Sequence, residues 1–328
     1  MKTHEQSAQN ELRQSKPLVY DKVIRFPEMM KRGEATPIVR LEYSYACNFH
    51  CSHCSISELQ KITGRRSMTP ADVKNIADQA DAMGLAQFVI SGGEPTIYPE
   101  FDAVVEAIGA KRFYITTDSN GWYLDDERAK HLKSIGVDKV QISIDNLNEF
   151  DHDDFRNKRG AWDRAVKAVI LSKQAGLKVL IQTVVDKQRV HSQELIDFLS
   201  HCNNVLGVPV YIGYAKPVGE WKHMSRLIDQ QDIDYISELE KRYNVFTHLT
   251  PAYGYQGGCI AVKRMINITK WGDVNPCPFM QEINLGNVFD EPLGVIVKRG
   301  MEKFGAHIPT CPMATDKDYI KNYAEEVK

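Results

Sequence analysis

The sequence predicts an α/β protein whose parallel β-sheet is covered by helices. Six short apolar runs, of the kind that form buried strands, alternate with amphipathic helical patterns along the first two thirds of the chain. This alternation is typical of strand–helix–strand units, in which the helix packs on the sheet between two parallel strands. At 328 residues the chain is long enough to bury a large core. The pattern fits an open doubly wound sheet, a barrel or a partial barrel.

The predicted elements follow one another at regular intervals. The first helix has the clearest limits, because Thr69 is a favourable N-cap, Pro70 suits the first helical position and Gly84 suits the end. The predicted strands are 38–44, 86–91, 112–117, 139–145, 178–185 and 209–215. The predicted helices between and after them are 69–84, 100–110, 125–135, 161–175, 191–201 and 229–242.

The alternation ends near residue 220, where a segment with glycine, proline and cysteine follows a last helical pattern. We therefore predict three parts: a partly flexible N-terminal extension (1–35), an α/β domain (36–220) and a smaller C-terminal domain (221–328). The extension is too short for a winged-helix domain of the kind that grips a leader peptide.

Composition and charge narrow the possible function classes. The net charge is −2 and no long run of basic residues occurs, so we expect no nucleic-acid partner. The chain shows neither a signal peptide nor 18 uninterrupted apolar residues, so we expect a cytoplasmic protein with no membrane association. In a reducing compartment, seven cysteines are better explained as metal ligands or catalytic thiols than as disulfides.

The stretch CNFHCSHC places Cys47, Cys51 and Cys54 in the loop after the first predicted strand. Loops at the carboxyl ends of parallel strands commonly carry chemistry. Three thiolates at this spacing can each bind one corner of a cubane cluster and leave the fourth iron open. A structural zinc ion is the alternative, but it requires four ligands, and His50 and His53 lie too close to the cysteines to complete the set without strain.

Together with three further motifs, this loop resembles the radical SAM superfamily. The motifs are Ser91-Gly92-Gly93-Glu94-Pro95 after the second strand, Asn120-Gly121 after the third and Ser143-Ile144-Asp145 at the fourth. The resemblance implies a partial (β/α)6 TIM-like barrel, and a 4Fe-4S cluster on the three cysteines that binds S-adenosylmethionine at its open iron. It also implies an enzyme that receives an electron from a donor such as flavodoxin or ferredoxin. The enzyme then cleaves S-adenosylmethionine to a 5'-deoxyadenosyl radical, which abstracts hydrogen from a substrate.

The resemblance further implies a set of residues that bind S-adenosylmethionine. The Gly92-Gly93 segment is expected to hold the methionyl ammonium, and Arg156 or, less favoured, Arg164 to pair with the carboxylate. His53 stands where the family often has an aromatic residue beside the adenine, which is a departure from the pattern. The other candidates for cofactor contact are Ser91, Glu94, Asn120, Ser143, Asp145 and Gln182.

A second cysteine pattern lies in the predicted C-terminal domain. Cys259 and Cys277 flank a predicted hairpin with Gly272 at its turn, in the spacing C-x12-G-x4-C, and Cys311 follows. This is similar to the auxiliary-cluster domain called SPASM in its full form and Twitch in its shorter one, and it implies a second 4Fe-4S cluster. Ala314 stands where a closing C-x2-C pair would have its second cysteine. Asp316 or His307 then supplies the fourth ligand, or one iron stays open; a zinc ribbon, the alternative, would need the close pair that is absent.

The resemblance leaves two substrate classes. Many auxiliary-cluster enzymes modify a ribosomally made peptide by cross-linking, epimerisation or excision, and we expect that class here. The alternative is oxidation or epimerisation of a small molecule such as a sugar, aminoglycoside or nucleotide. The short extension weakens the peptide interpretation but is compatible with a separate leader-peptide-binding protein.

Overall fold

A computed structural model describes residues 2–32, 37–221, 226–252 and 257–325. It contains a nine-stranded sheet with the strand order β7-β6-β5-β4-β3-β2-β1-β8-β9. Every neighbouring pair from β7 to β8 is parallel, and only β8 and β9 run antiparallel. The strands are β1 (Ile38–Ser44), β2 (Gln87–Gly92), β3 (Tyr114–Ser119), β4 (Lys139–Ser143), β5 (Lys178–Val185), β6 (Val210–Tyr214), β7 (Val245–Thr247), β8 (Met265–Ile268) and β9 (Val274–Asn275).

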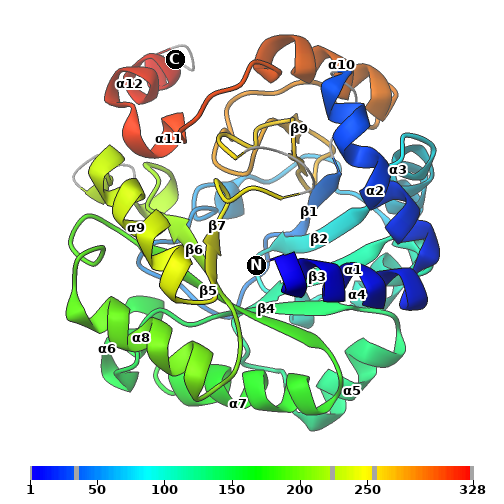
Figure 1. Cartoon of the computed structure of the whole chain (residues 1–328). Coiled ribbons are helices and arrows are strands. Elements are labelled where there is room, and N and C mark those ends of the chain that lie inside the picture. The colour runs from blue at the N-terminus through cyan, green and yellow to red at the C-terminus, as the bar shows by residue number, and fades with distance from the viewer. Residues whose placement is uncertain (1, 33–36, 222–225, 253–256, 326–328) are drawn as a thin grey trace.

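The helices surround this curved sheet on its outer side (Figure 1). Those predicted from the sequence are α3 (Pro70–Ala82), α4 (Phe101–Ile108), α5 (Asp126–Ser134), α7 (Ala161–Gln174), α8 (Gln193–Asn204) and α9 (Gln230–Arg242). The helices that were not predicted are α1 (Lys2–Ser15), α2 (Pro17–Lys31), α6 (Glu149–Arg156), α10 (Leu293–Phe304), α11 (Pro312–Thr315) and α12 (Lys317–Glu325). The prediction of an α/β fold with a parallel sheet is confirmed.

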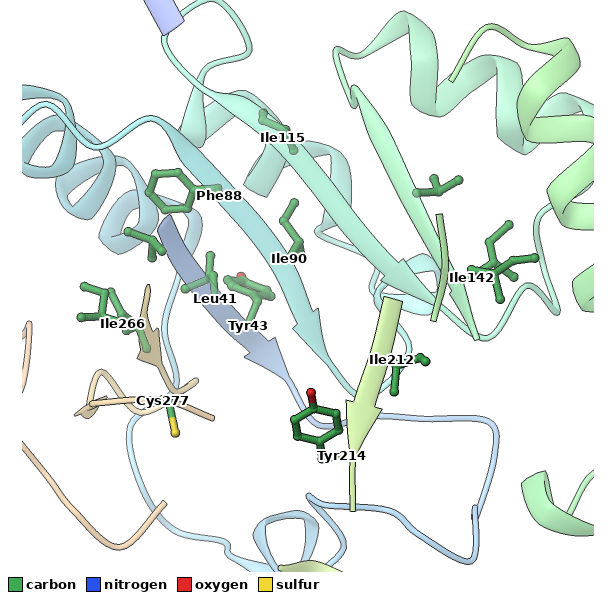
Figure 2. Close-up of a cluster of buried hydrophobic side chains, with 14 of the residues drawn as sticks. Leu41, Tyr43, Phe88, Ile90, Ile115, Ile142, Ile212, Tyr214, Ile266 and Cys277 are labelled. Carbon is green, nitrogen blue, oxygen red and sulfur yellow. The ribbon is translucent and has the colours of Figure 1, made fainter. Parts of the chain in front are cut away.

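Side chains alternate between the two faces of the sheet. Leu41, Phe88 and Ile142 point to the outer face and are fully buried. Figure 2 shows these side chains together with others of the same core. The intervening residues, such as Arg40 and Gln141, point to the inner face and line a cavity. A strand with a period of two thus gives an apolar outer face under the helices and a polar inner face.

Two lysines attach the N-terminal helices to the rest of the fold. Lys16 pairs with Asp138, which precedes β4, and Lys22 pairs with Asp81 at 2.6 Å. Burial lowers the pKa of both lysines. Part of the extension predicted as flexible lies outside the described residues, at positions 1 and 33–35.

The sheet continues past the boundary predicted near residue 220. β7 pairs with β6, and β8 pairs with β1, so both edges of the six-stranded part are extended by strands from the C-terminal segment. The division into domains therefore remains a prediction. In the part of the chain that the structure describes, no helix is both long enough and apolar enough to cross a membrane.

Candidate active site

Six of the seven cysteines line a single cavity of about 520 Å³ inside the curved sheet. Cys47, Cys51 and Cys54 come from the loop after β1, as the sequence predicted. The others, Cys259, Cys277 and Cys311, come from the C-terminal segment. The seventh, Cys202, is buried in α8 away from the cavity.

Two backbone hydrogen bonds tie the loop that carries Cys47 to the turn after β2. Gly93 N donates to Ser44 O at 2.9 Å, and Glu94 N donates to Ala46 O at 2.9 Å. A Cβ at Gly93 would lie 2.0 Å from Ala46 O, and one at Gly92 would lie 2.2 Å from Ser44 O. The glycines are therefore needed for the approach of one backbone to another, in addition to the predicted approach of a ligand.

Glu94 connects the same turn to the end of β3. Its carboxylate accepts hydrogen bonds from Thr96 N and Thr96 Oγ1, from Ser119 Oγ at 2.9 Å and from Asn120 N at 2.6 Å. The side chain is 1% exposed, and this burial raises its pKa. Because its oxygens already have protein donors, Glu94 positions the loop after β3, and a direct contact with S-adenosylmethionine stays a prediction.

Arg156, at the end of α6, links the cysteine loop to β4 through a buried ion pair. Its Nε donates to Asp145 Oδ2 at 2.6 Å, and its Nη1 lies 3.9 Å from Cys51 Sγ. The Arg156 guanidinium holds the pKa of Asp145 below its usual range despite burial, and Val184 N donates to the other carboxylate oxygen at 3.1 Å. His152 accepts from Asp145 N at 3.1 Å, which requires a neutral ring. Arg156 therefore already pairs with Asp145. Binding of the methionyl carboxylate by Arg156 would have to share its guanidinium with this protein carboxylate.

His53 fills the predicted aromatic position by stacking. Its ring lies 4.3 Å from that of Phe155 at an interplanar angle of 12°, and Trp221 lies 5.7 Å away. Burial lowers the pKa of His53 to about 3, so the imidazole is neutral. It behaves as a flat, uncharged wall of the cavity, which is the property that an adenine contact would need.

The predicted site residues are brought together with one exception. Asp145 does not line the cavity but orients Arg156, which does. The predicted residues that line the cavity beside the cysteines are His53, Ser91, Gly92, Gly93, Glu94, Asn120, Ser143, Arg156 and Gln182.

The cysteine thiols of the first loop are poor nucleophiles in the metal-free chain. Burial raises the pKa of Cys47 to about 12 and also raises the pKa of Cys51 and Cys54. A catalytic thiol needs the opposite shift, whereas a metal ion can displace the thiol proton on binding. Among the described residues, no three His, Cys, Asp or Glu side chains lie close enough to hold one metal ion. In a cluster, by contrast, each of the three thiolates would bind a different iron.

The C-terminal cysteines lie on three separate segments. Cys259 N donates to Ile308 O at 2.8 Å, so the segment just before Cys311 lies beside Cys259. The predicted hairpin is present as β8 and β9, with Gly272 at a φ of +82° in its turn. Cys277 follows β9, and Figure 2 shows it among the side chains of the buried cluster. Three segments far apart in sequence therefore present one thiol each to the cavity.

Of the two fourth ligands suggested by the sequence, neither lines the cavity. His307 and Asp316 are both exposed, and Ala314, at the position of the absent cysteine, is fully buried. Buried cations surround the C-terminal cysteines instead. Lys216 is 6% exposed and Lys263 is 3% exposed, and both act electrostatically on Cys259.

The inner face of the sheet carries a hydrogen-bonded network of which the sequence analysis selected only Ser91. Arg40 Nη1 lies 3.0 Å from Asp118 Oδ2, Ser91 Oγ donates to the same oxygen at 2.7 Å, and Gln141 Nε2 donates to Oδ1 at 2.5 Å. These residues sit on β1 to β4 and line the cavity. The signal in the sequence was polar residues at alternating positions of otherwise apolar strands, which became interpretable only with strand register.

Comparisons with known proteins agree with this geometry. A profile described as the Radical SAM superfamily matches residues 41–199, which include the cysteine loop and the motifs after β2, β3 and β4. The mycofactocin maturase MftC of Mycobacterium tuberculosis is 30% identical over 78% of this chain and 68% of its own length. The chain belongs to the radical SAM superfamily. An AdoMet-dependent heme synthase of Methanosarcina barkeri is 21% identical over 80% of this chain and 82% of its own length.

Solved structures show the same fold. The crystal structure of SuiB from Streptococcus suis bound to its precursor peptide SuiA superimposes with a TM-score of 0.66. It is 18% identical to this radical SAM chain and covers 83% of it and 67% of SuiB. The predicted partial TIM-like barrel is therefore confirmed. As members of this superfamily use a 4Fe-4S cluster and S-adenosylmethionine, the predicted enzyme class and these two cofactors are confirmed as well.

Proposed function

We propose that this enzyme modifies a ribosomally made peptide by radical SAM chemistry, aided by an auxiliary 4Fe-4S cluster. Cys47, Cys51 and Cys54 hold the cluster that binds S-adenosylmethionine. The second cluster sits on Cys259, Cys277 and Cys311. The observation that carries the proposal is that both cysteine sets line one cavity, so a substrate between them contacts both centres.

The side chains around the first cysteine set suit an anionic cluster and a flat ligand. Arg156 lies beside Cys51, where its positive charge favours a thiolate. When bound, the cluster and S-adenosylmethionine supply one-electron chemistry that abstracts hydrogen from a substrate carbon. The residues of this chain orient the components: His53, whose ring stacks on Phe155, forms part of the cavity wall, and the Gly92-Gly93 turn holds the cysteine loop in place.

The second cysteine set also suits a cluster. Among the described residues, Lys216 Nζ donates one hydrogen bond, to Tyr214 O at 3.2 Å, although an ammonium has three donors. A buried ammonium needs a nearby negative charge, and a cluster held by three thiolates provides it. Such a cluster would accept an electron from a substrate radical or orient the substrate.

Relatives support the peptide class over the small-molecule class. MftC is named as a maturase of mycofactocin, and SuiB was crystallised with a precursor peptide. We place the reaction in the cytoplasm, with flavodoxin or ferredoxin as electron donor and with a separate leader-peptide-binding protein where the precursor requires one. Heme synthesis, the activity in the name of the Methanosarcina relative, is the second activity to test.

The test compares substrates on the anaerobically reconstituted enzyme. Short peptides encoded beside the gene, and separately an iron tetrapyrrole as a candidate precursor of heme, are incubated with S-adenosylmethionine and dithionite. We expect a mass change in one peptide, accompanied by 5'-deoxyadenosine in a fixed ratio to it. Mass spectrometry of the peptide and chromatography of the nucleoside measure the two products.

Two controls define the outcome. A Cys51→Ala variant should give neither product, because the first cluster is lost. Conversion of the tetrapyrrole with every peptide unchanged would overturn the peptide assignment while leaving the radical chemistry intact.

A further inference from the structure

We propose that His248 is the fourth protein ligand of the auxiliary cluster. It would supply the ligand that the sequence motif lacks because Ala314 replaces the last cysteine. The inference rests on the proposed function, because it requires a cluster on Cys259, Cys277 and Cys311. It concerns a residue that neither cysteine motif includes. His248 directly follows β7, at the carboxyl end of that strand, and lines the same cavity as the three cysteines.

The imidazole of His248 has an unused buried nitrogen. The residue is 7% exposed, and its Nε2 has no hydrogen-bond partner among the described residues. Leaving a buried polar atom without a partner costs roughly 1–3 kcal/mol, so native structures seldom do so without a reason such as a bound ion. An iron–nitrogen bond would satisfy this atom, because imidazole nitrogen is a common iron ligand.

The His248 ring has a fixed place next to the cysteine segments. Arg264 Nη2 donates to His248 O at 2.8 Å, and the ring packs edge-on against Tyr214 at 5.0 Å. Gly258 N, which immediately precedes Cys259, donates to Leu249 O at 3.3 Å. The segment of His248 and the segment of Cys259 therefore run side by side, and His248 is held by a hydrogen bond to its backbone and by the packing of its ring against Tyr214.

Other ligands in the cavity are less suitable. Lys216 is an ammonium with no free lone pair while it is charged. Burial raises the pKa of Tyr211 to about 12, so its phenol keeps its proton. The exposed residues His307 and Asp316 would have to leave solvent and move into the cavity. His248 needs no such movement, since it is buried at the cavity wall.

The experiment isolates the auxiliary cluster and looks for nitrogen bound to it. The full chain with Cys47, Cys51 and Cys54 changed to Ala is reconstituted anaerobically, so that any cluster belongs to the C-terminal set. We expect about four irons per chain. After reduction with dithionite, pulsed electron paramagnetic resonance should detect strongly coupled nitrogen, and labelling histidine with ¹⁵N should change that coupling. Neither readout depends on turnover.

Variants assign the nitrogen. In the same background, His248→Gly should lose the coupling and recover it when imidazole is added, which also shows that the variant is folded. His248→Cys should keep about four irons without nitrogen coupling. His307→Ala, the matched control, should keep the coupling unchanged.

The outcomes separate the two claims. A four-iron cluster without nitrogen coupling, or with coupling that persists in His248→Gly without imidazole, would overturn the ligand assignment and leave the auxiliary cluster standing. Ligation by the thioether of Met280 or Met313, which also line the cavity, would give the first of these results. Iron at background in the parent variant would overturn the auxiliary cluster itself and the assignment with it.

Discussion

The two cysteine sets differ in how the chain builds them. Cys47, Cys51 and Cys54 lie within eight residues of one loop, and each is only partly buried. Cys259, Cys277 and Cys311 span 53 residues, and all three are buried and belong to the main hydrophobic core. The first set therefore belongs to one loop at the end of a barrel strand, whereas the second set is part of the packed hydrophobic core. We therefore expect changes in the first set to affect chemistry and changes in the second to affect stability as well.

The largest difference is expected from removing one set at a time. Cys47, Cys51 and Cys54 changed together to Ala should lower the formation of 5'-deoxyadenosine at least about 1000-fold, since this reaction depends wholly on the first cluster. The corresponding C-terminal triple variant should still cleave S-adenosylmethionine but convert no substrate. Product assays under dithionite measure both. An equal loss of S-adenosylmethionine cleavage in the two variants would contradict the assignment of cleavage to the first cysteine set alone.

Low pH should destabilise the contacts of His152, which help to hold Arg156 beside the first cysteine set. Burial lowers the pKa of His152 to about 4, and the neutral ring accepts a hydrogen bond from Asp145 N. In the unfolded chain, His152 takes up a proton near pH 6.5. As the pH falls from 6.5 to 4, the unfolded state therefore binds more protons than the folded state, and the free energy of unfolding decreases. The contribution is about 3 kcal/mol, from about 1.4 kcal/mol per pKa unit.

His152→Asn tests this contribution. Asn keeps an acceptor near the position of Nδ1 but does not titrate. Denaturant unfolding of the iron-free proteins at pH 6.5 and pH 4.5 should show a smaller loss of stability in the variant. An unchanged loss would mean that other groups cause the acid sensitivity.

The same contrast explains what the sequence predicted and what it did not. The first site was predictable because its three ligands are close in sequence and its supporting motifs follow successive strands in order. Arg40, Lys216 and His248 were missed because their roles depend on which faces of distant strands meet in the cavity. Helix α6 was missed because its sequence, EFDHDDFR, has only two apolar residues and is held through polar contacts of His152 and Arg156.

A steric change at the base of the first loop should have a smaller effect. Gly93→Ala would place a Cβ 2.0 Å from Ala46 O, so the cysteine loop must move away from β2. We expect a loss of about 1–3 kcal/mol in the free energy of unfolding and incomplete iron loading of the first set. Gly213→Ala is the matched control, because its Cβ would meet Thr183 O at an ordinary 3.6 Å inside the same cavity. Equal iron loading in both variants would argue against the glycine turn as the support of the loop.

The smallest expected effect compares one thiol from each set in the iron-free chain. Cys277→Ser replaces a buried sulfur by a more polar hydroxyl, and burying a hydroxyl that is not fully hydrogen-bonded costs roughly 1–3 kcal/mol. Cys47→Ser makes the same exchange at a partly buried position on the cavity wall, where water can reach the hydroxyl, so we expect about 0.5 kcal/mol or less. The chemistry of the exchange is identical, and only the surroundings differ. Denaturant midpoints of the two variants measure the difference. If Cys47→Ser were the more destabilising, the first set would be as much a part of the core as the second, and its location in a loop would not explain its separate role.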